Sequence, residues 1–447
     1  MSLMSDRMKK EKKKNNKIIL AGCLLAVLVL FGAAGYGILE NENSAESEVM
    51  QKGNSEEFLS KETTQEELEE CQSDEEYLEN QTGIETENTA SLSEESDLEE
   101  RIEEYIQNMS LEEKAAQLFI ITPESLVGIG TVTAAGDTTK KAFEEYPVGG
   151  LVYFEKNLIS SDQVNSMLSN IQKYSMERMN LPAFTCLDEE GGTVTRISRT
   201  GKFDVPDIES MEIIGQNQNV EAAYEAGSQM GAYLSELGFN IDFAPVADVL
   251  SNPDNEVVKH RSFGSDPNLV SEMCLAVCQG LQEHQVCAVL KHFPGHGATE
   301  ADSHKGNAYT LKSLEELQKC EWIPFQNGID HHVPFIMVGH ISLPNITGDD
   351  TPASLSEIMI YQILRNQMGY DGIVITDGMN MRAVTLRYSS GEAAVKALQA
   401  GVDLILMPTD FKGAYQGILD AVRQGILSEE RIDESLRRIL AVKMQLM

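Results

Sequence analysis

The residues with the clearest chemical potential lie in the stretch from Lys291 to His304, which reads KHFPGHGATEADSH. It contains three of the chain's eight histidines, together with an aspartate, two glycines and a proline. Such a stretch is consistent with three kinds of site: a metal site, a phosphate-binding loop, or a flexible loop that carries a proton to a substrate. Each kind predicts a different enzyme, so the spacing of the residues has to decide between them.

The spacing disfavours a phosphate-binding loop and a metal site. The stretch lacks the GxxxxGK[ST] arrangement that opens a helix around a phosphate. Four side chains are competent metal ligands, namely His292, His296, Asp302 and His304. No helical HExxH pattern holds them on one face, and ordering the glycine-containing segment between them would cost conformational entropy. We therefore expect neither a metal nor a cofactor, and a metal site remains the lesser alternative.

The sequence DSH at the end of the stretch fits proton transfer. In an extended segment, a histidine two residues after an aspartate lies on the same side as the carboxylate. Asp302 can then hold one tautomer of His304 and raise its basicity, which makes a general acid/base dyad. Such a dyad needs a nucleophile across the site. Asp377 is the leading candidate, because it ends the apolar run GIVITD and so places a carboxylate on a rigid element.

Short apolar or β-branched runs recur from residue 99 onward, mostly separated by helical patterns. There are eight: QLFIIT, VGGLVYF, AFTCLD, FNIDFAP, VCAVLK, PFIMVGH, GIVITD and VDLILM. Two helix starts carry the spacing of a capping box, Ser110 with Glu113 and Ser313 with Glu316. Buried strands that alternate with helices predict a parallel sheet covered by helices, and eight strands close an α/β barrel of the (β/α)8 TIM type.

Five of these runs end in a polar residue or are followed by one within three residues. These residues are Asp188, Asp248, Lys291, His340 and Asp377. In a barrel all carboxyl ends of the strands face one rim, and that rim carries the active site. A helix N-cap would explain an aspartate at one such position, but lysine and histidine are poor caps. Together the five predict a functional rim, in which the role of Asp248 could be structural.

The order of the motifs resembles a known family. KHFPGHG with its DSH, the upstream LDEEGGTVTRI, RSFG between them and the downstream ITDGMNM resemble glycoside hydrolase family 3, in its β-N-acetylglucosaminidase branch. The resemblance covers residues 100–447. It implies a single (β/α)8 catalytic domain over residues 99–447, and hydrolysis with retention of configuration through a covalent glycosyl-enzyme.

The resemblance also implies roles for individual side chains. Asp377 matches the family's nucleophile, and His304 with Asp302 matches its acid/base dyad on a mobile loop. Asp188 matches the residue that binds sugar hydroxyls at the non-reducing end. The remaining positions that match the sugar subsite are Arg196, Arg261, Lys291 and His292.

The chain departs from the family pattern at four positions. Glu189, Thr193, Lys259 and Gly378 stand where the family usually has Gln, Arg, Gly and Asp. None of these changes removes a group that the mechanism requires, but they leave the aglycone preference open. Many members have a second α/β domain that supplies the acid/base. Here the chain ends in an amphipathic helical pattern, so the proton donor is expected from the barrel itself.

The N-terminal part predicts a membrane anchor. Residues 18–39 carry no charge, and a helix of about 20 such residues crosses the hydrocarbon core of a bilayer. The basic tail, residues 1–17, precedes this segment and an acidic stretch follows it, which predicts a cytoplasmic N-terminus and an extracytoplasmic body. A cleaved signal peptide and lipidation at Cys23, within LAGC, are the alternatives.

The acidity of the chain is concentrated in one segment. Residues 41–100 hold twenty-one Asp or Glu against two Lys, which accounts for −19 of the formal net charge of −36. Residues 40–98 have few large apolar side chains and are expected to form a disordered linker. Neither the linker nor the body offers a basic stripe, which excludes nucleic acid as a partner. The cysteines do not indicate a disulfide framework.

The expected function is that of an exo-acting β-N-acetylhexosaminidase. A membrane-anchored, monomeric enzyme would remove terminal β-linked N-acetylglucosamine from peptidoglycan fragments or related oligosaccharides such as those of chitin. A β-N-acetylglucosaminide phosphorylase is the nearest alternative, because a site without a second carboxylate also tolerates incoming phosphate. A non-catalytic cell-wall sugar-binding protein is an alternative of another class. The presence of Asp377, Asp302 and His304 together argues against it.

Overall fold

The computed structural model describes residues 96–299 and 308–447, all of which belong to the unit Leu92–Met447. The proposed membrane segment at 18–39 and the basic tail lie outside these residues, as does the linker up to residue 95. Within the two described ranges, no helix is both long and apolar enough to cross a bilayer. Residues 96–108 are helical, so the described fold begins slightly before the linker boundary expected at residue 98.

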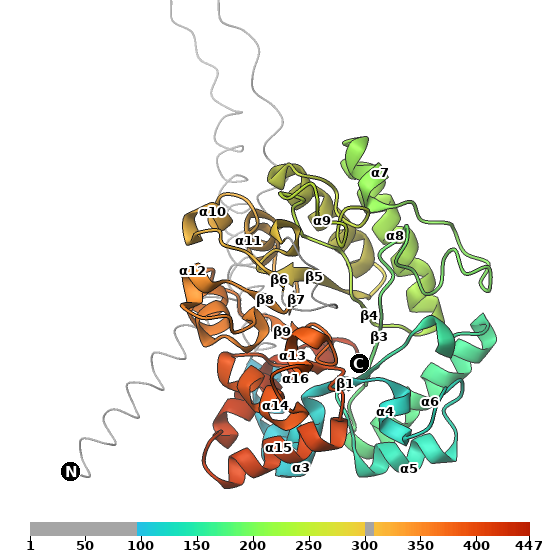
Figure 1. The fold of residues 1–447 in the computed structure, drawn as a ribbon. Helices are drawn as coiled ribbons and strands as arrows, with labels where there is room; N and C mark the ends of the chain where they lie inside the picture. Colours follow the sequence, from blue (N-terminus) through green and yellow to red (C-terminus); the bar gives the residue numbers. More distant parts are fainter. Residues whose placement is uncertain (1–95, 300–307) are drawn as a thin grey trace, which may run out of the picture. The chain divides into compact units, whose positions relative to one another are not determined.

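Eight parallel strands form the centre of the fold (Figure 1). In sheet order they are β10 (Ile405–Leu406), β1 (Phe119–Ile121), β2 (Gly150–Val152), β3 (Phe184–Leu187), β4 (Ile241–Asp242), β5 (Cys287–Phe293), β7 (Phe335–Val338) and β9 (Ile373–Thr376). Seven of them lie within the apolar runs of the sequence, and β5 continues two residues beyond the run VCAVLK. The two ends of the sheet meet where Ile375 bridges Leu404 and the Thr376 N–H donates to the Leu404 carbonyl at 3.0 Å. The predicted barrel is confirmed.

Helices follow the strands and surround them (Figure 1). They are α3 (Leu111–Gln117), α4 (Pro123–Val127), α5 (Asp137–Glu145), α6 (Ser161–Met179), α7 (Met211–Gln216), α8 (Val220–Leu237), α9 (Pro267–Gln282), α10 (Leu314–Gln318), α11 (Ile323–Asp330), α12 (Pro344–Thr347), α13 (Arg382–Thr385), α14 (Ser390–Ala400), α15 (Phe411–Arg423) and α16 (Glu429–Gln445). A π-helix, η4 (Ile358–Gln367), occupies the crossover between β7 and β9. Both predicted capping boxes are present, at the starts of α3 and α10.

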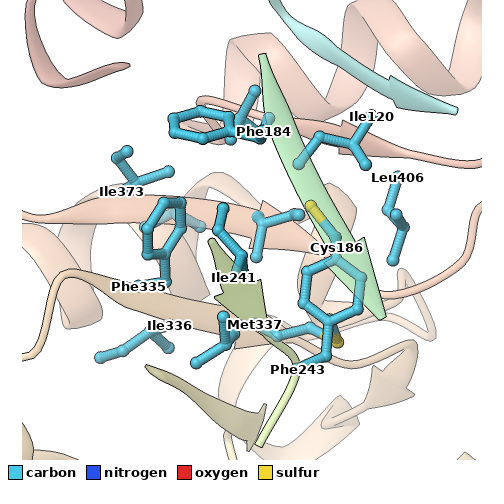
Figure 2. Packing of buried hydrophobic residues seen from close by; sticks show 14 of the residues in the cluster. Ile120, Phe184, Cys186, Ile241, Phe243, Phe335, Ile336, Met337, Ile373 and Leu406 are labelled. Atoms are coloured by element: carbon cyan, nitrogen blue, oxygen red, sulfur yellow. The ribbon is translucent and has the colours of Figure 1, made fainter. Parts of the chain in front are cut away.

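The barrel interior is filled by side chains (Figure 2). The rings of Phe184 in β3 and Phe335 in β7 meet edge to face with centroids 5.7 Å apart, although these strands are not neighbours in the sheet. Both rings are fully buried, and removing such a side chain from water contributes about 1.5–3 kcal/mol. Because this core leaves no open pore, the polar groups that act on a ligand are confined to the ends of the strands.

A small second sheet lies at the rim where the strands end. Its strand β6 (Ala308–Tyr309) directly follows residues 300–307 and pairs in parallel with β8 (Ile341–Ser342). β8 follows β7 after two intervening residues. The pairing therefore returns the chain to the carboxyl end of β7 after the segment that carries Asp302 and His304.

At the opposite end of the barrel, one ionisable side chain is buried without an oppositely charged partner among the described contacts. Lys443 of α16 is fully buried, and its Nζ donates to Oε1 of Gln117 at 2.9 Å and lies 4.9 Å from the ring centre of Phe184. Gln117 precedes β1 and Phe184 begins β3, so the group lies at the amino ends of the strands. Burial lowers the pKa of Lys443 from 10.5 to about 7.

Replacing Lys443 with methionine should therefore stabilise the protein near pH 7. The unfolded chain binds a proton at this lysine up to about pH 10.5, whereas the folded chain releases it near pH 7. The lysine thus imposes a folding penalty, roughly 1.4 kcal/mol per unit of pKa difference, that is complete below pH 7 and fades as the pH rises toward 10. Urea unfolding of both proteins at pH 6, 8 and 10 measures the difference, which should shrink with rising pH.

The exposed Lys173 in α6 provides the control, since its side chain is 64% exposed beside Glu177. Lys173→Met should change the free energy of unfolding by less than about 1 kcal/mol at every pH. If Lys443→Met were destabilising at pH 6, or its effect independent of pH, the neutral state of the buried amine would be refuted.

Candidate active site

The carboxyl ends of three strands bring the predicted rim residues together. Asp188 follows β3, Lys291 is the third residue from the end of β5, and Asp377 follows β9. Parallel strands in a barrel present these ends on the same side, and this is the side on which active sites are built. The contacts between these residues and their neighbours define a single polar site.

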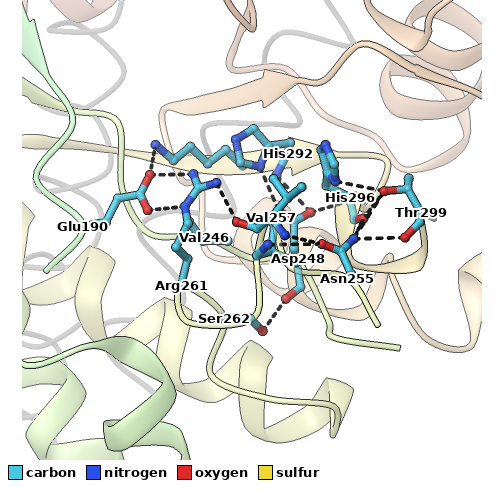
Figure 3. Close-up of polar contacts among 12 residues, drawn as sticks. Glu190, Val246, Asp248, Asn255, Val257, Arg261, Ser262, His292, His296 and Thr299 are labelled. Atoms are coloured by element: carbon cyan, nitrogen blue, oxygen red, sulfur yellow. Dashed lines mark hydrogen bonds and ion pairs between the residues drawn. The ribbon is translucent and has the colours of Figure 1, made fainter. Parts of the chain in front are cut away.

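A buried cluster of opposite charges forms one wall of this site. The Nζ of Lys291 lies 2.5 Å from Oε1 of Glu190 and 3.0 Å from Oδ1 of Asp188. Arg261 donates two hydrogen bonds to the same Glu190 carboxylate, at 2.7 and 2.8 Å (Figure 3). Burial alone would raise the pKa of Glu190, but Arg261 and Lys291 hold it far below its usual value. The cluster is therefore fully charged, and its geometry is fixed by paired hydrogen bonds.

Asp188 connects this cluster to the open rim. Its Oδ1 faces Lys291, and its Oδ2 accepts a hydrogen bond from Nη2 of Arg196 at 3.1 Å. The guanidinium of Arg196 also lies 5.5 Å from the ring centre of Phe154. Asp188 remains 21% exposed, so it can accept hydrogen bonds from the hydroxyl groups of a ligand. The buried ammonium of Lys291 balances its charge.

A second carboxylate positions the loop that carries Arg196. Glu189 is fully buried and accepts hydrogen bonds from the backbone N–H groups of residues 196, 197 and 198 at 2.5 to 2.9 Å. The hydroxyl of Tyr233 donates to it as well, at 2.9 Å. Four donors offset the cost of burying this carboxylate. Glu189, a position where the sequence departs from the family pattern, therefore holds the rim loop rather than the substrate.

Asp248 organises the histidines of the KHFPGHG motif (Figure 3). Its Oδ2 lies 2.7 Å from Nδ1 of His292, and its Oδ1 accepts the backbone N–H groups of His292 and His296. Burial would raise the pKa of Asp248, but His292 and these N–H donors lower it. An ionised Asp248 can only accept, so Nδ1 of His292 carries a proton. The structural role expected for Asp248 is present in these contacts.

The described part of this motif, up to Thr299, is packed against the rest of the protein. His292, His296 and Thr299 are all at most 6% exposed. Asn255 donates from its side chain to the carbonyls of His296 and Thr299, and a Cβ at Gly297 would lie only 1.9 Å from the Val249 carbonyl oxygen. Close backbone approach, and not flexibility, explains that glycine. The predicted dyad of Asp302 and His304 lies in residues 300–307, outside the described residues.

Asp377 has the ionisation expected of a nucleophile. Its N–H donates to the Val338 carbonyl at 2.9 Å, and its Oδ1 accepts the N–H of Gly378 at 2.7 Å. Burial raises the pKa of Asp377, but His292, His340 and further positive groups outweigh it and bring the pKa to about 2. The carboxylate is therefore anionic at any ordinary assay pH, and it remains partly exposed at the rim.

His340 supports the turn that follows Asp377. Its Nε2 lies 3.0 Å from the Gly378 carbonyl oxygen, and its Nδ1 lies 2.7 Å from Oγ of Ser354. A carbonyl can only accept, so Nε2 carries a proton. His340 and Ser354 are both buried, so the contact holds the backbone next to the carboxylate in one position.

Two important residues of this site were not singled out as such from the sequence. Glu190 neutralises Lys291 and Arg261, and its only sequence signal is the run of three acids, DEE, at the end of a buried strand. Such a run predicts that at least one acid has a buried cation as partner. His340 was recognised as a strand-end residue, but its contact with Gly378 depends on the spacing of β7 and β9.

Replacing Glu190 with glutamine should strongly destabilise the protein. The variant keeps the shape of the side chain but leaves Lys291 and Arg261 buried with less negative charge, and breaking a buried ion pair costs about 3–5 kcal/mol. Urea unfolding at pH 7 measures the loss. The matched control is Glu256→Gln, since the 73% exposed Glu256 pairs with Lys259 at the surface and should contribute less than about 1 kcal/mol. Equal effects of the two substitutions would contradict the assignment.

The fold and the rim define an α/β-barrel protein with a charged, hydrogen-bonding site at the carboxyl ends of its strands. Residues 110–442 match the family model described as glycosyl hydrolase family 3 N terminal domain. The chain belongs to glycoside hydrolase family 3. The resemblance found from the motifs is thereby confirmed.

Several relatives within this similarity are named for hexosaminidase activity. The β-hexosaminidase A of Pseudoalteromonas piscicida is 32% identical over 67% of this chain and 54% of its own length. The β-hexosaminidase LpqI of Mycobacterium tuberculosis is 36% identical over 59% of this chain and 68% of its own length. A solved family 3 β-N-acetylglucosaminidase from Paenibacillus sp. FPU-7 is 36% identical with a TM-score of 0.71, covering 75% of this chain and 62% of that one. The chain thus spans only part of the length of these proteins.

Proposed function

We propose that this protein is a retaining, exo-acting β-N-acetylhexosaminidase. It would release terminal β-linked N-acetylglucosamine from peptidoglycan fragments or related oligosaccharides. The observation that carries the proposal is the anionic Asp377 at the carboxyl end of β9, on the same rim as the charged cluster of Asp188, Lys291 and Glu190. The names of the similar proteins support the same substrate class.

The side chains of the rim take the roles that their chemistry allows. Asp188 accepts hydrogen bonds from sugar hydroxyls, and Arg196, Lys291 and His292 donate them. Arg261 acts mainly by holding Glu190, because both of its donated bonds to that carboxylate are already formed. Asp377 attacks the anomeric carbon and forms a covalent glycosyl-enzyme.

Proton transfer would come from His304, oriented by Asp302. Retaining glycosidases generally use two carboxylates about 5–5.5 Å apart. Here an imidazole replaces the second carboxylate. His304 donates its proton to the leaving oxygen in the first step and, once neutral, deprotonates the attacking water in the second. An imidazole does not repel an anionic leaving group as a second carboxylate would.

One assay separates this proposal from its alternatives. The full chain is incubated with a chromogenic β-N-acetylglucosaminide and a chromogenic β-glucoside, with and without phosphate, and the sugar products are identified. We expect preferential release of free N-acetylglucosamine at a rate independent of phosphate. Formation of N-acetylglucosamine phosphate would identify a phosphorylase, and binding of the sugar without any release would identify a non-catalytic binding protein. Either result would overturn the proposal.

We propose further that residues 18–39 anchor the enzyme in a membrane, with the catalytic part outside the cytoplasm. The proposal rests on the uncharged segment and the basic residues before it. Extraction of membranes with alkaline carbonate tests it: the full chain should stay with the membrane, and a chain lacking residues 18–39 should not. Complete extraction of the full chain would refute the anchor.

A further inference from the structure

The turn after the nucleophile contains one of the chain's departures from the family pattern. Gly378, which stands where the family usually has Asp, directly follows Asp377. Its N–H donates to Oδ1 of Asp377 at 2.7 Å. This hydrogen bond fixes the rotation of the carboxylate and leaves Oδ2 as the oxygen that attacks. The aim of the nucleophile therefore depends on the orientation of the Gly378 backbone.

A glycine gives such a turn little rigidity of its own, because a residue without Cβ has the widest choice of backbone conformations. The turn is held toward β10 by the Met379 N–H, which donates to the Leu406 carbonyl at 2.9 Å. Toward β7, the Gly378 carbonyl accepts a hydrogen bond from Nε2 of His340 at 3.0 Å. The ring of His340 thus ties the turn to the neighbouring strand end.

Ser354 fixes the orientation of this ring. Its Oγ lies 2.7 Å from Nδ1 of His340, and the two residues are 0% and 1% exposed. A serine hydroxyl can donate to a neutral imidazole or accept from a cationic one, so the contact persists in both protonation states. Without it, the broad torsional preference of a histidine ring would let Nε2 turn away from the Gly378 carbonyl.

The segment that carries Ser354 is anchored on two sides. Ser354 lies in the 3₁₀-helix η3 (Ala353–Leu355). Shortly before it, the Asp350 carbonyl accepts hydrogen bonds from Oγ of Ser342 in β8 and from Nη1 of Arg387, both at 2.8 Å. Arg387 follows α13, the helix after the nucleophile's turn. The hydroxyl is therefore presented from a segment that is fixed between β8 and the chain that continues from the nucleophile.

We infer that Ser354 is a positioning residue for the nucleophile. Through His340 it holds the Gly378 backbone, and so the carboxylate oxygen of Asp377 that attacks the sugar. The inference rests on the proposed function, because it assumes that Asp377 attacks an N-acetylglucosaminide. It assigns the hydroxyl a contribution to the transition state and none to the binding of the sugar itself.

Removing the hydroxyl tests the inference. The full chain with Ser354→Ala is assayed with 4-nitrophenyl β-N-acetylglucosaminide, whose leaving group needs no proton, so kcat/KM reports the attack by Asp377. We expect kcat/KM to fall at least about tenfold, because a small misplacement of reacting atoms is costly in rate. The inhibition constant of N-acetylglucosamine as a competitive inhibitor should stay within about twofold of the wild-type value, because ground-state binding is unaffected.

Two further variants separate positioning from stability, with urea unfolding to verify the fold of each. The matched control is Ser175→Ala, since Ser175 is also fully buried and donates to the Leu181 carbonyl at 2.7 Å, just before β3. It should lose stability as Ser354→Ala does but keep the wild-type kcat/KM. The second is His340→Phe, alone and combined with Ser354→Ala. The combined variant should have the kcat/KM of His340→Phe alone, because Ser354 acts through that ring.

Three results would overturn the positioning role alone: an unchanged kcat/KM in Ser354→Ala, an equal loss in Ser175→Ala, or losses that multiply in the combined variant. A wild type that releases no nitrophenol would overturn the proposed function and this inference with it.

Discussion

Replacing Asp377 with alanine should lower the turnover of a β-N-acetylglucosaminide by about 10⁴-fold or more while the protein remains folded. The reason is that Asp377 places an ionised carboxylate, with a pKa of about 2, at the carboxyl end of β9, and no other described carboxylate does so. Without it the glycosyl-enzyme cannot form. The measurement is steady-state hydrolysis, with urea unfolding to verify the fold.

A small external nucleophile sharpens this experiment. In the alanine variant, azide can enter the space left by the carboxylate and attack the same face of the sugar. Turnover should then recover in part, and the product should be a glycosyl azide of inverted configuration. A retained configuration, or wild-type turnover by the variant without azide, would rule out Asp377 as the nucleophile.

The matched control is Asp371→Ala. Asp371 lies shortly before the same strand, at its opposite end, with a side chain that is 54% exposed beside Arg438. Removing this carboxylate should leave kcat/KM nearly unchanged. Comparable losses in the two variants would show that the effect of Asp377→Ala is structural.

The low pKa of Asp377 also restricts the pH profile. Burial raises this pKa, but His292, His340 and the other positive groups lower it to about 2, so the carboxylate is protonated only near or below that pH. Loss of kcat/KM between pH 4 and pH 7 therefore reports a different group. Of the two groups proposed to exchange bonds or protons with the substrate, Asp377 and His304, only His304 has an ordinary pKa in the neutral range.

Replacing His304 with alanine should produce a loss that depends on the leaving group. For N,N′-diacetylchitobiose, whose leaving group needs a proton, kcat/KM should fall by about 10²–10⁴-fold. For 4-nitrophenyl β-N-acetylglucosaminide, whose leaving group departs without one, kcat/KM should change little. Its kcat should still fall, because the second step has lost its general base, and the glycosyl-enzyme should accumulate with a burst of nitrophenol.

The pH profile gives a second readout for this variant. Wild-type kcat/KM for the disaccharide should decline as the pH rises through the pKa of the acid, and this decline should disappear in His304→Ala. His331→Ala serves as the control, since His331 is exposed after α11 and should affect neither substrate. Equal losses on both substrates in His304→Ala, with an unchanged pH profile, would refute its role in proton transfer.

The barrel could be predicted because its signals are local. Each of the eight strands comes from a largely apolar run that is buried on both faces. Ser110 and Ser313 mark helix starts through capping boxes, in which each serine pairs with a glutamate three residues later. The polar residues at the strand ends could likewise be recognised, because the barrel sends all carboxyl ends to one rim. This was sufficient to bring Asp188, Lys291 and Asp377 to one site.

The partners of these residues depended on contacts between distant segments. Glu190 meets Lys291 and Arg261 across separations of 101 and 71 residues, and which of the acids in DEE turns toward the cations is decided only when the strands pack. Glu189, one of the four departures from the family pattern, accepts the Arg196 N–H and so holds the loop that carries Arg196. Neither assignment has a signature in local sequence.

The amino-acid sequence by itself determined the barrel, the nucleophile candidate and the family, because burial patterns and short motifs express preferences of neighbouring residues. Only the tertiary structure decided which charges neutralise one another, that the described part of the KHFPGHG motif is packed, and which buried side chains hold the turn after Asp377. These properties depend on distances between side chains far apart in the chain, and electrostatic and packing energies change steeply over a few ångströms.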